Sequence, residues 1–339
     1  MKDDKLLPFP QVVIVSPALA DANNGNWQTA RRWQRFLALP TRIIRQWPDE
    51  FADQDRVMLA LHARRSSSSI AAWREARRVR GLAVVLTGTD LYRDIETDAS
   101  AQLSLQLADA LVVLQERGPL ALPAELHDKT RVIFQSMSRR KTLPKSQKRL
   151  HALMVGHLRE EKDPATLFAA ARLLAERDDI RIDHIGNALD PLLGEAATAT
   201  MAATSAYRWL GGLPHAATRR RIQRADLLIH ASRLEGGAHV VMEAVCSGTP
   251  VIASAIAGNI GMLGRDYAGY YNCGDAQGLA ALLVQCRASQ GLRDGLLACL
   301  AAQCRPRAAL FAPAAERAAL RQLVADLLVS PLTDPLAAI

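Results

Sequence analysis

The chain alternates short apolar, β-branched runs with longer segments in which apolar residues recur at helical spacing. This alternation is typical of parallel α/β sheets, in which a helix follows each strand. Residues 26–39 illustrate the helical spacing, because Trp27, Ala30, Trp33 and Leu37 fall on one face. The runs with the length and composition of buried strands are 11–16, 41–46, 56–62, 82–87, 110–114, 131–134, 151–156, 180–185, 207–210, 226–232, 249–254 and 269–273.

A polar, basic stretch without apolar period interrupts this pattern at residues 136–149, which read SMSRRKTLPKSQKR. It separates two similar series of strands, so we predict two doubly wound, Rossmann-like domains of α/β class. Their expected bounds are 1–140 and 151–305, with a linker at 141–150 and a helical tail at 306–339. Ligands of open α/β sheets bind beyond the carboxyl ends of the strands. We therefore expect two facing domains with the active site in the cleft between them.

Composition narrows the class of protein. The 339 residues are 49% hydrophobic and 22% charged, which fits a soluble globular enzyme. No apolar run approaches the roughly 18 residues of a membrane span, and residues 1–10 lack the apolar region of a signal peptide. A cytoplasmic protein without membrane association is therefore expected. The five cysteines are odd in number and form no C-x-x-C pair, which argues against a disulfide framework and a zinc site.

The net charge of +8 indicates a surface that attracts anions. The chain shows no nucleic-acid-binding module, and its arginines are scattered, so nucleic acid is not an expected partner. Composition does not choose between the remaining anionic partners, and it leaves the oligomeric state open.

The segment 232–248, SRLEGGAHVVMEAVCSG, directly follows an apolar strand. Gly236 and Gly237 permit a tight turn and a close approach of the backbone to a ligand. A helix that begins near Ala238 would present free N–H groups to an anion. Glu243 lies among apolar residues of this helix, and a buried carboxylate requires polar partners, which ribose or sugar hydroxyls would supply. Taken singly, Glu235 and Glu243 are equally compatible with solvent-exposed positions.

The segment 155–164, VGHLREEKDP, follows the first strand of the second domain. Arg159 and Lys162 are three residues apart and would lie on one side of a first helical turn. Two cations together with helix N–H groups suit a diphosphate. The same residues are also compatible with an exposed basic turn.

In the first domain, the segment 87–93, TGTDLYR, follows a strand. Asp90 is either a helix N-cap or a group that lines the cleft. Thr87, Thr89 and Arg93 offer hydroxyls and a cation to the same cleft.

Two more positions of this domain lie at strand ends. His62, with Arg64, ends the preceding strand and is either structural or part of an acceptor site. The stretch 23–26, NNGN, which includes Gly25, is either a ligand-approach loop or a turn.

The spacing of Glu235 and Glu243 resembles the E-x7-E element of the retaining glycosyltransferases of family four, which have the glycosyltransferase-B (GT-B) fold. The run 156–164 is similar to that family's diphosphate segment, and GGLPH at 211–215 is similar to its base-holding loop. ADLLIHAS and SGTPVIAS complete a resemblance that covers most of residues 151–275. It implies that Glu243 binds the ribose and Glu235 a donor-sugar hydroxyl, while Arg159 and Lys162 neutralise the departing nucleotide.

The residues that the resemblance implies fall into two sets. The catalytic set is Arg159, Lys162 and Glu235. The donor-binding set is Gly25, Gly212, Leu213, Gly236, Gly237, Ala238, His239 and Glu243. No cofactor is expected. No metal is expected either, because no Asp-x-Asp pair lies at a strand end to hold one.

Within the family, the runs LHARRS, LTGTDLYRD, SRLEGGA and GNIGMLG are similar to the selenosugar synthases of selenoneine biosynthesis. This subgroup joins selenophosphate to a UDP-sugar, so the resemblance implies UDP-N-acetylglucosamine or UDP-glucose as donor and selenophosphate as acceptor. The implied acceptor-binding residues are His62, Arg64, Thr89, Asp90 and Arg93. Where the wider family has G-G-x-P-E, this chain reads GNIGM at 258–262, so that family's glutamate is absent.

Two other functions remain open. One is a glycosyltransferase with a lipid or polysaccharide acceptor, which would dock at an anionic membrane through Arg31, Arg32 and Arg35. The other is a nucleotide-sugar-binding protein without catalytic activity. The sequence leaves open the preferred sugar and the anomeric outcome.

Overall fold

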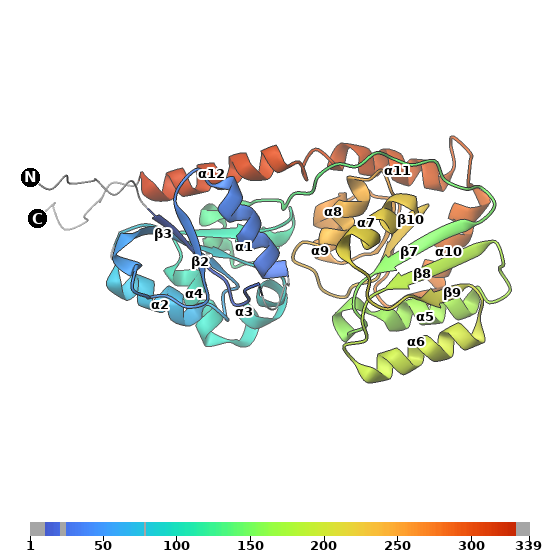
Figure 1. The fold of residues 1–339 in the computed structure, drawn as a ribbon, viewed down its shortest axis with the longest axis horizontal. Coiled ribbons are helices and arrows are strands. Elements are labelled where there is room, and N and C mark those ends of the chain that lie inside the picture. Colours follow the sequence, from blue (N-terminus) through green and yellow to red (C-terminus); the bar gives the residue numbers. More distant parts are fainter. Residues whose placement is uncertain (1–10, 21–24, 78, 330–339) are drawn as a thin grey trace, which may run out of the picture. The chain divides into compact units, whose positions relative to one another are not determined.

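The computed structural model describes residues 11–20, 25–77 and 79–329, and these form two units (Figure 1). The N-terminal unit takes in Met1–Gln135 and Ala314–Ile339, and the C-terminal unit is Ser136–Pro313. Within the described residues, each unit contains one parallel six-stranded sheet. No helix in these residues is long and apolar enough to cross a membrane. The cleft expected between the two domains stays a prediction.

The sheet of the N-terminal unit has the order β2-β1-β3-β4-β5-β6, with every neighbouring pair parallel. Its strands are β1 (Gln11–Val15), β2 (Thr41–Ile44), β3 (Asp55–Leu61), β4 (Leu82–Val85), β5 (Ala110–Val113) and β6 (Thr130–Val132). The strands expected in this half of the sequence are all present, with ends that differ by one or two residues. That prediction is confirmed.

Alternate residues of these strands pack against different helices. Val13 and Val15 lie in an apolar cluster with α2 (Ser67–Ala76) and α4 (Ala99–Leu107). Val12 and Ile14 lie in a second cluster with α1 (Gly25–Phe36) and α12 (Pro313–Leu328). Successive side chains of a strand point to opposite faces, so the sheet is covered on both sides. This explains why its strands are apolar throughout.

The segment expected as a helical tail, 306–339, does not stand apart from the fold. Its helix α12 buries Leu320, Leu323, Val324 and Leu327 in the same cluster as Trp33 of α1. The carboxylate of Glu316 on α12 is also buried, and it accepts hydrogen bonds from Trp33 Nε1 at 2.7 Å and Arg32 Nε at 2.8 Å. The last described helix is therefore part of the core of the N-terminal unit, because its apolar face covers the sheet.

The sheet of the C-terminal unit has the order β12-β11-β10-β7-β8-β9 and is also parallel. Its strands are β7 (Leu150–Val155), β8 (Ile180–Ile185), β9 (Tyr207–Trp209), β10 (Leu227–His230), β11 (Val251–Ser254) and β12 (Tyr270–Tyr271). Helix α5 (Pro164–Leu173) packs against α6 (Pro191–Ala203) and α10 (Ala276–Ala288) beside it (Figure 1). Helix α11 (Leu296–Arg307) contacts α10, α9 (Ala257–Leu263) and α8 (His239–Val245), and α8 in turn contacts α7 (His215–Arg224). The expected strands of this half are confirmed as well.

The basic stretch at 136–149 has no regular structure and is anchored to the C-terminal unit. Lys145 Nζ donates to the carbonyl oxygens of Gln223 and Ala225 at the end of α7, both at 2.6 Å. Burial lowers the pKa of Lys145 to about 8. The predicted linker thus belongs in large part to the C-terminal unit, whose described boundary is residue 136.

The strand order indicates at which strands each sheet would bind a ligand. In the C-terminal unit the chain moves outward from β7 to β8 and β9, whereas β10 to β12 lie on the other side of β7. The connections therefore diverge between β7 and β10, and the carboxyl ends of these two strands are the position at which open α/β sheets bind their ligands. In the N-terminal unit the corresponding point lies between β1 and β3.

Candidate functional site

The loops that follow β7 and β10 are joined directly. The backbone N–H of Arg233 donates to Glu161 O at 2.9 Å, and its Nη2 lies 3.2 Å from Asp163 Oδ1. Lys162 Nζ donates to Glu235 Oε1. The structure thus brings together the two segments that the sequence singled out separately, at the point where the strand order predicts a ligand.

Glu235 is held through one of its two carboxylate oxygens. Besides Lys162, Ser232 Oγ donates to Oε1 at 2.8 Å, and His230 Nε2 lies 3.4 Å from it. Within the described residues, Oε2 makes no hydrogen bond. Burial would raise the pKa of Glu235, but Lys162 and the hydrogen bond from His230 outweigh it and hold this pKa well below its usual range. The residue is a carboxylate with one oxygen available as an acceptor.

Glu243 repeats this arrangement on α8. Its side chain is 7% exposed, and Oε1 accepts from His215 Nε2 at 2.7 Å, with Arg219 Nη1 at 3.8 Å. Oε2 makes no hydrogen bond in the part of the chain that the structure describes. The hydrogen bond to Glu243 raises the pKa of His215, against the opposing effect of burial. Arg219 is 2% exposed, and its Nη2 donates to Ser138 O at 3.1 Å.

Arg159 is not among the partners of Glu235 or of Glu243. Its side chain is 48% exposed, and its Nε lies 3.8 Å from Glu161 Oε2. The expected helical turn is the short 3-10 turn η5 (Glu160–Lys162), with Arg159 just before it. The structure therefore brings Lys162, but not Arg159, into contact with the E-x7-E glutamates.

The turn that precedes α8 packs tightly on α9. A Cβ atom on Gly258 would lie 2.1 Å from Glu235 O, so a glycine is required there. The backbone N–H of Ala238, just before His239 begins α8, donates to Met262 Sδ at 3.1 Å. Met262 stands where the resembling family has its glutamate. The thioether is a weak acceptor, so it satisfies in the free protein an N–H that we expected to face the ligand.

The remaining donor-side positions are glycine-rich. Gly211 has a φ of 65°, which favours glycine, and its carbonyl accepts from Gly186 N–H at 2.9 Å. A Cβ on Gly212 would lie 2.1 Å from Asn187 Oδ1, so the loop with Leu213 packs on the loop after β8. Gly25 is the first residue of α1, with open space around it, while Asn23 and Asn24 lie outside the described residues.

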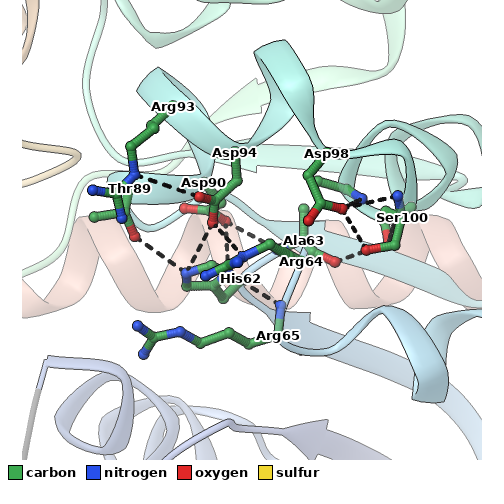
Figure 2. A network of polar contacts seen from close by, with 12 residues as sticks. His62, Ala63, Arg64, Arg65, Thr89, Asp90, Arg93, Asp94, Asp98 and Ser100 are labelled. Carbon is green, nitrogen blue, oxygen red and sulfur yellow. Dashed lines mark hydrogen bonds and ion pairs between the residues drawn. The ribbon is translucent and has the colours of Figure 1, made fainter.

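His62 is at the centre of a polar network in the N-terminal unit (Figure 2). It is 2% exposed and has a φ of 75°, a strained value for a residue other than glycine. Its Nδ1 accepts from the N–H of Arg65 at 3.3 Å, so the ring proton is on Nε2, which lies 3.2 Å from Thr89 Oγ1. Burial and the nearby arginines lower the pKa of His62, against the opposing charges of Asp90 and Asp94. The imidazole is therefore a neutral donor to Thr89.

Asp90 is fully buried, and the backbone occupies both of its oxygens. Oδ2 accepts from Ala63 N–H at 2.9 Å, while Oδ1 accepts from the N–H groups of Thr87 at 2.8 Å and Gly88 at 3.0 Å. These bonds join the loop after β3 to the loop after β4. The geometry favours this structural role for Asp90 over contact with a ligand or the N-cap that was the other expectation.

Two arginines of this network remain accessible. Arg64 Nε donates to Asp94 Oδ2 at 3.0 Å, and Arg93 Nε lies 3.6 Å from Asp94 Oδ1, with the side chains 43% and 58% exposed. Both positions depend on the single π-helical turn η2 (Asp90–Asp94), a form that is frequent at functional sites. Asp94 was not expected from the sequence, although it ends the quoted run LTGTDLYRD.

Sequence reasoning also missed four residues of the C-terminal cluster. His215 and Arg219 contact Glu243, and His230 and Ser232 contact Glu235. His230 and Ser232 are part of the quoted run ADLLIHAS, directly after an apolar strand, and that position was the available signal.

The sequence of the C-terminal unit is similar to a known protein family. Residues 136–292, which are 157 of the 339 residues, match the family model "Glycosyl transferases group 1". The C-terminal unit therefore carries the sequence features of group 1 glycosyltransferases. No curated protein matches the chain in sequence.

Solved structures extend the similarity to the whole chain at the level of fold. Sucrose-phosphate synthase from Thermosynechococcus elongatus has a TM-score of 0.72 at 17% identity, over 94% of this chain and 99% of that one. HepE from Anabaena, in complex with UDP and glucose, has a TM-score of 0.67 at 16% identity, over 95% and 99%. The pneumococcal O-GlcNAc transferase GtfA, in complex with UDP and GlcNAc, has a TM-score of 0.64 at 18% identity, over 81% and 58%.

The chain spans between 55% and 58% of the length of the first structures that it matches. At these identities the similarity shows the fold, which is GT-B as expected.

Proposed function

We propose that this protein is a glycosyltransferase that moves a sugar from a UDP-sugar to selenophosphate and forms a selenosugar. One observation carries the donor half of this proposal. Glu235 and Glu243 each use Oε1 to bind protein donors, and each leaves Oε2 without a hydrogen bond in the described residues. Two fixed carboxylates with accessible acceptor oxygens suit the hydroxyl groups of a sugar and a ribose.

The donor is proposed to be UDP-N-acetylglucosamine or UDP-glucose. UDP is bound in the structures of HepE and GtfA, which have the same fold. In the proposal, Glu243 accepts from the ribose and Glu235 from the donor sugar. Lys162 then leaves Glu235 and contacts the diphosphate. There the charge of Lys162 stabilises UDP as UDP departs. Arg159 is exposed and can reach the same anion only by moving its side chain.

The reaction exchanges one bond for another at the anomeric carbon. The bond from this carbon to the β-phosphate oxygen breaks, and its electron pair leaves with UDP. A selenium lone pair of selenophosphate forms the new carbon–selenium bond. Because selenium is a soft nucleophile that is already anionic, the step needs no dedicated general base.

The acceptor is proposed to bind the N-terminal unit. Selenophosphate is a small anion, and Arg64 and Arg93 offer two accessible guanidinium groups beside the hydroxyl of Thr89. His62 supports Thr89 through its Nε2–H. In the proposal, Asp90 joins the two loops and does not bind the substrate. Because backbone N–H groups occupy its carboxylate, it is not a free negative charge that would repel an anionic substrate.

The alternative with a lipid or polysaccharide acceptor has less support in the structure. One of its three docking residues, Arg32, is 15% exposed and bound to the buried Glu316. Tyr92, the aromatic residue near the acceptor loops, accepts a hydrogen bond from Gln115 at 2.6 Å. Vesicle co-sedimentation tests this alternative, and binding to anionic vesicles would favour it.

The test of the proposal is UDP release from each UDP-sugar with selenophosphate, phosphate or a sugar alcohol as acceptor. We expect release that depends on selenophosphate and a product with the selenium isotope pattern in mass spectrometry. Arg93→Ala should weaken the use of selenophosphate while leaving UDP affinity unchanged. The matched control is Arg56→Ala, the same change at an exposed position near the amino end of β3, whereas His62 and Arg64 follow the carboxyl end of that strand. Release that is independent of selenophosphate would refute the acceptor, and tight UDP binding without any turnover would favour a binding protein.

A further inference from the structure

A directional chain of hydrogen bonds leads from the interior of the C-terminal unit to Glu235. His230, the last residue of β10, is 2% exposed, and its Nε2 lies 3.3 Å from Ser232 Oγ. Ser232 Oγ in turn donates to Glu235 Oε1 at 2.8 Å. The serine has a single proton and gives it to the carboxylate, so its oxygen must accept from His230. Nε2 of His230 therefore carries a proton.

The other ring nitrogen of His230 is the less favourable position for the proton. Its Nδ1 is buried and makes no hydrogen bond within the described part of the chain. A proton on Nδ1 would be a buried donor without an acceptor, which costs more than leaving the nitrogen bare. The Nε2 proton of the ring is therefore directed at Ser232 and at Glu235 Oε1, 3.4 Å away.

The backbone around this chain is fixed from two further elements. Ser232 O accepts from Ser254 Oγ at 2.6 Å at the end of β11, and Ser254 O accepts from Asn259 Nδ2 at 3.0 Å in α9. Gly258 allows α9 to pack against Glu235 O. Ser254 and Asn259 are fully buried. His230 and Ser232 therefore act from a rigid frame.

We propose that His230 is a positioning residue for recognition of the donor sugar, an inference that rests on the proposed function. In the free protein, Lys162 also holds Glu235 Oε1. When Lys162 turns to the diphosphate of a bound donor, Glu235 loses that partner. Ser232, held by His230, then keeps Oε1 in place, so that Oε2 stays directed at a hydroxyl of the sugar. UDP without its sugar does not need this contact.

The test compares UDP with UDP-glucose by titration calorimetry in four variants. His230→Leu removes the side chain that donates a hydrogen bond to Ser232, and His230→Gln retains an N–H group that can donate it. Ser232→Ala removes the hydroxyl that links His230 to Glu235. His151→Gln is the matched control, because His151 is at the amino end of the neighbouring strand β7. Loss of one supporting hydrogen bond predicts UDP-glucose binding about five- to tenfold weaker in His230→Leu and Ser232→Ala. UDP binding should change less than twofold, and His230→Gln should stay close to the wild type.

Each outcome separates the inference from the proposed function. An equal loss for UDP and UDP-glucose, or no loss for either, overturns the role of His230 but leaves the donor site intact. A wild-type protein that binds neither ligand overturns both.

The tautomer of His230 is a second test, which needs neither a ligand nor a variant. Imidazole nitrogen chemical shifts in the free protein should show a proton on Nε2. A ring protonated at Nδ1 would contradict the direction of the chain and overturn the inference.

Discussion

Replacing Glu243 with glutamine substitutes an NH2 group for one carboxylate oxygen. The change removes one negative charge and keeps the side-chain volume nearly constant. Hydrogen bonds to a charged group contribute about 1.5–3 kcal/mol. If the carboxylate binds the ribose, its loss should weaken UDP binding roughly 10- to 150-fold, since each 1.36 kcal/mol is a factor of ten. Titration calorimetry with UDP measures this directly, without the need for an acceptor.

The same substitution affects the protein in a second way, which must be measured beside the first. Arg219 is 2% exposed and has Glu243 as its nearest carboxylate, with Nη1 at 3.8 Å from Oε1. Leaving it without a counter-charge should lower the free energy of unfolding by up to about 3 kcal/mol. The pKa of His215, raised by its bond to Glu243, should fall in the variant.

The matched control is Glu195→Gln, the same change at an exposed position of α6. It should leave UDP affinity and stability unchanged. A folded Glu243→Gln variant that binds UDP within threefold of the wild type would refute the assignment of Glu243 to the nucleotide.

Three further predictions concern other parts of the molecule. Lys162→Met should act mainly on kcat and lower it by about 100- to 1,000-fold, because the charge of Lys162 matters most as UDP departs, and activity should survive EDTA; magnesium-dependent activity would contradict this. Burial lowers the pKa of His184 to about 4 from 6.5, so the unfolded chain takes up the proton first. Stability should therefore decline by roughly 3 kcal/mol as the pH falls from about 6.5 to 4, and His184→Leu should flatten this decline in urea unfolding. Glu316→Ala should lower the free energy of unfolding by about 3 kcal/mol, since it removes the buried partner of Arg32 and Trp33. Asp326→Ala, which removes an exposed ion pair on the same helix, should leave the free energy of unfolding nearly unchanged.

The sequence predicted the framework of the site because the signals concerned are local. Apolar runs marked the strands, and the residues just after them, such as Lys162 and Glu235, had to lie at one edge of a parallel sheet. The spacing of Glu235 and Glu243 then identified a specific element, and the structure places both at that edge.

The partners of these residues could not be predicted, because they depend on tertiary contacts. His215 and Glu243 are 28 residues apart and meet only when α7 packs beside α8. Asp90 was expected near a ligand, but backbone N–H groups, which every residue type supplies, occupy it instead. Likewise, the sequence predicted a helical tail, but not the sheet that α12 covers.

The central claim, transfer of a glycosyl group to selenium, is tested most directly by nuclear magnetic resonance of the product. Donor labelled with carbon-13 at the anomeric position and selenophosphate enriched in selenium-77 are incubated with the full chain. The account predicts a one-bond carbon–selenium coupling at the anomeric signal, which appears as UDP is released and is lost in Lys162→Met. An anomeric signal without selenium coupling, with the sugar bonded to oxygen in water, phosphate or another acceptor, would contradict it.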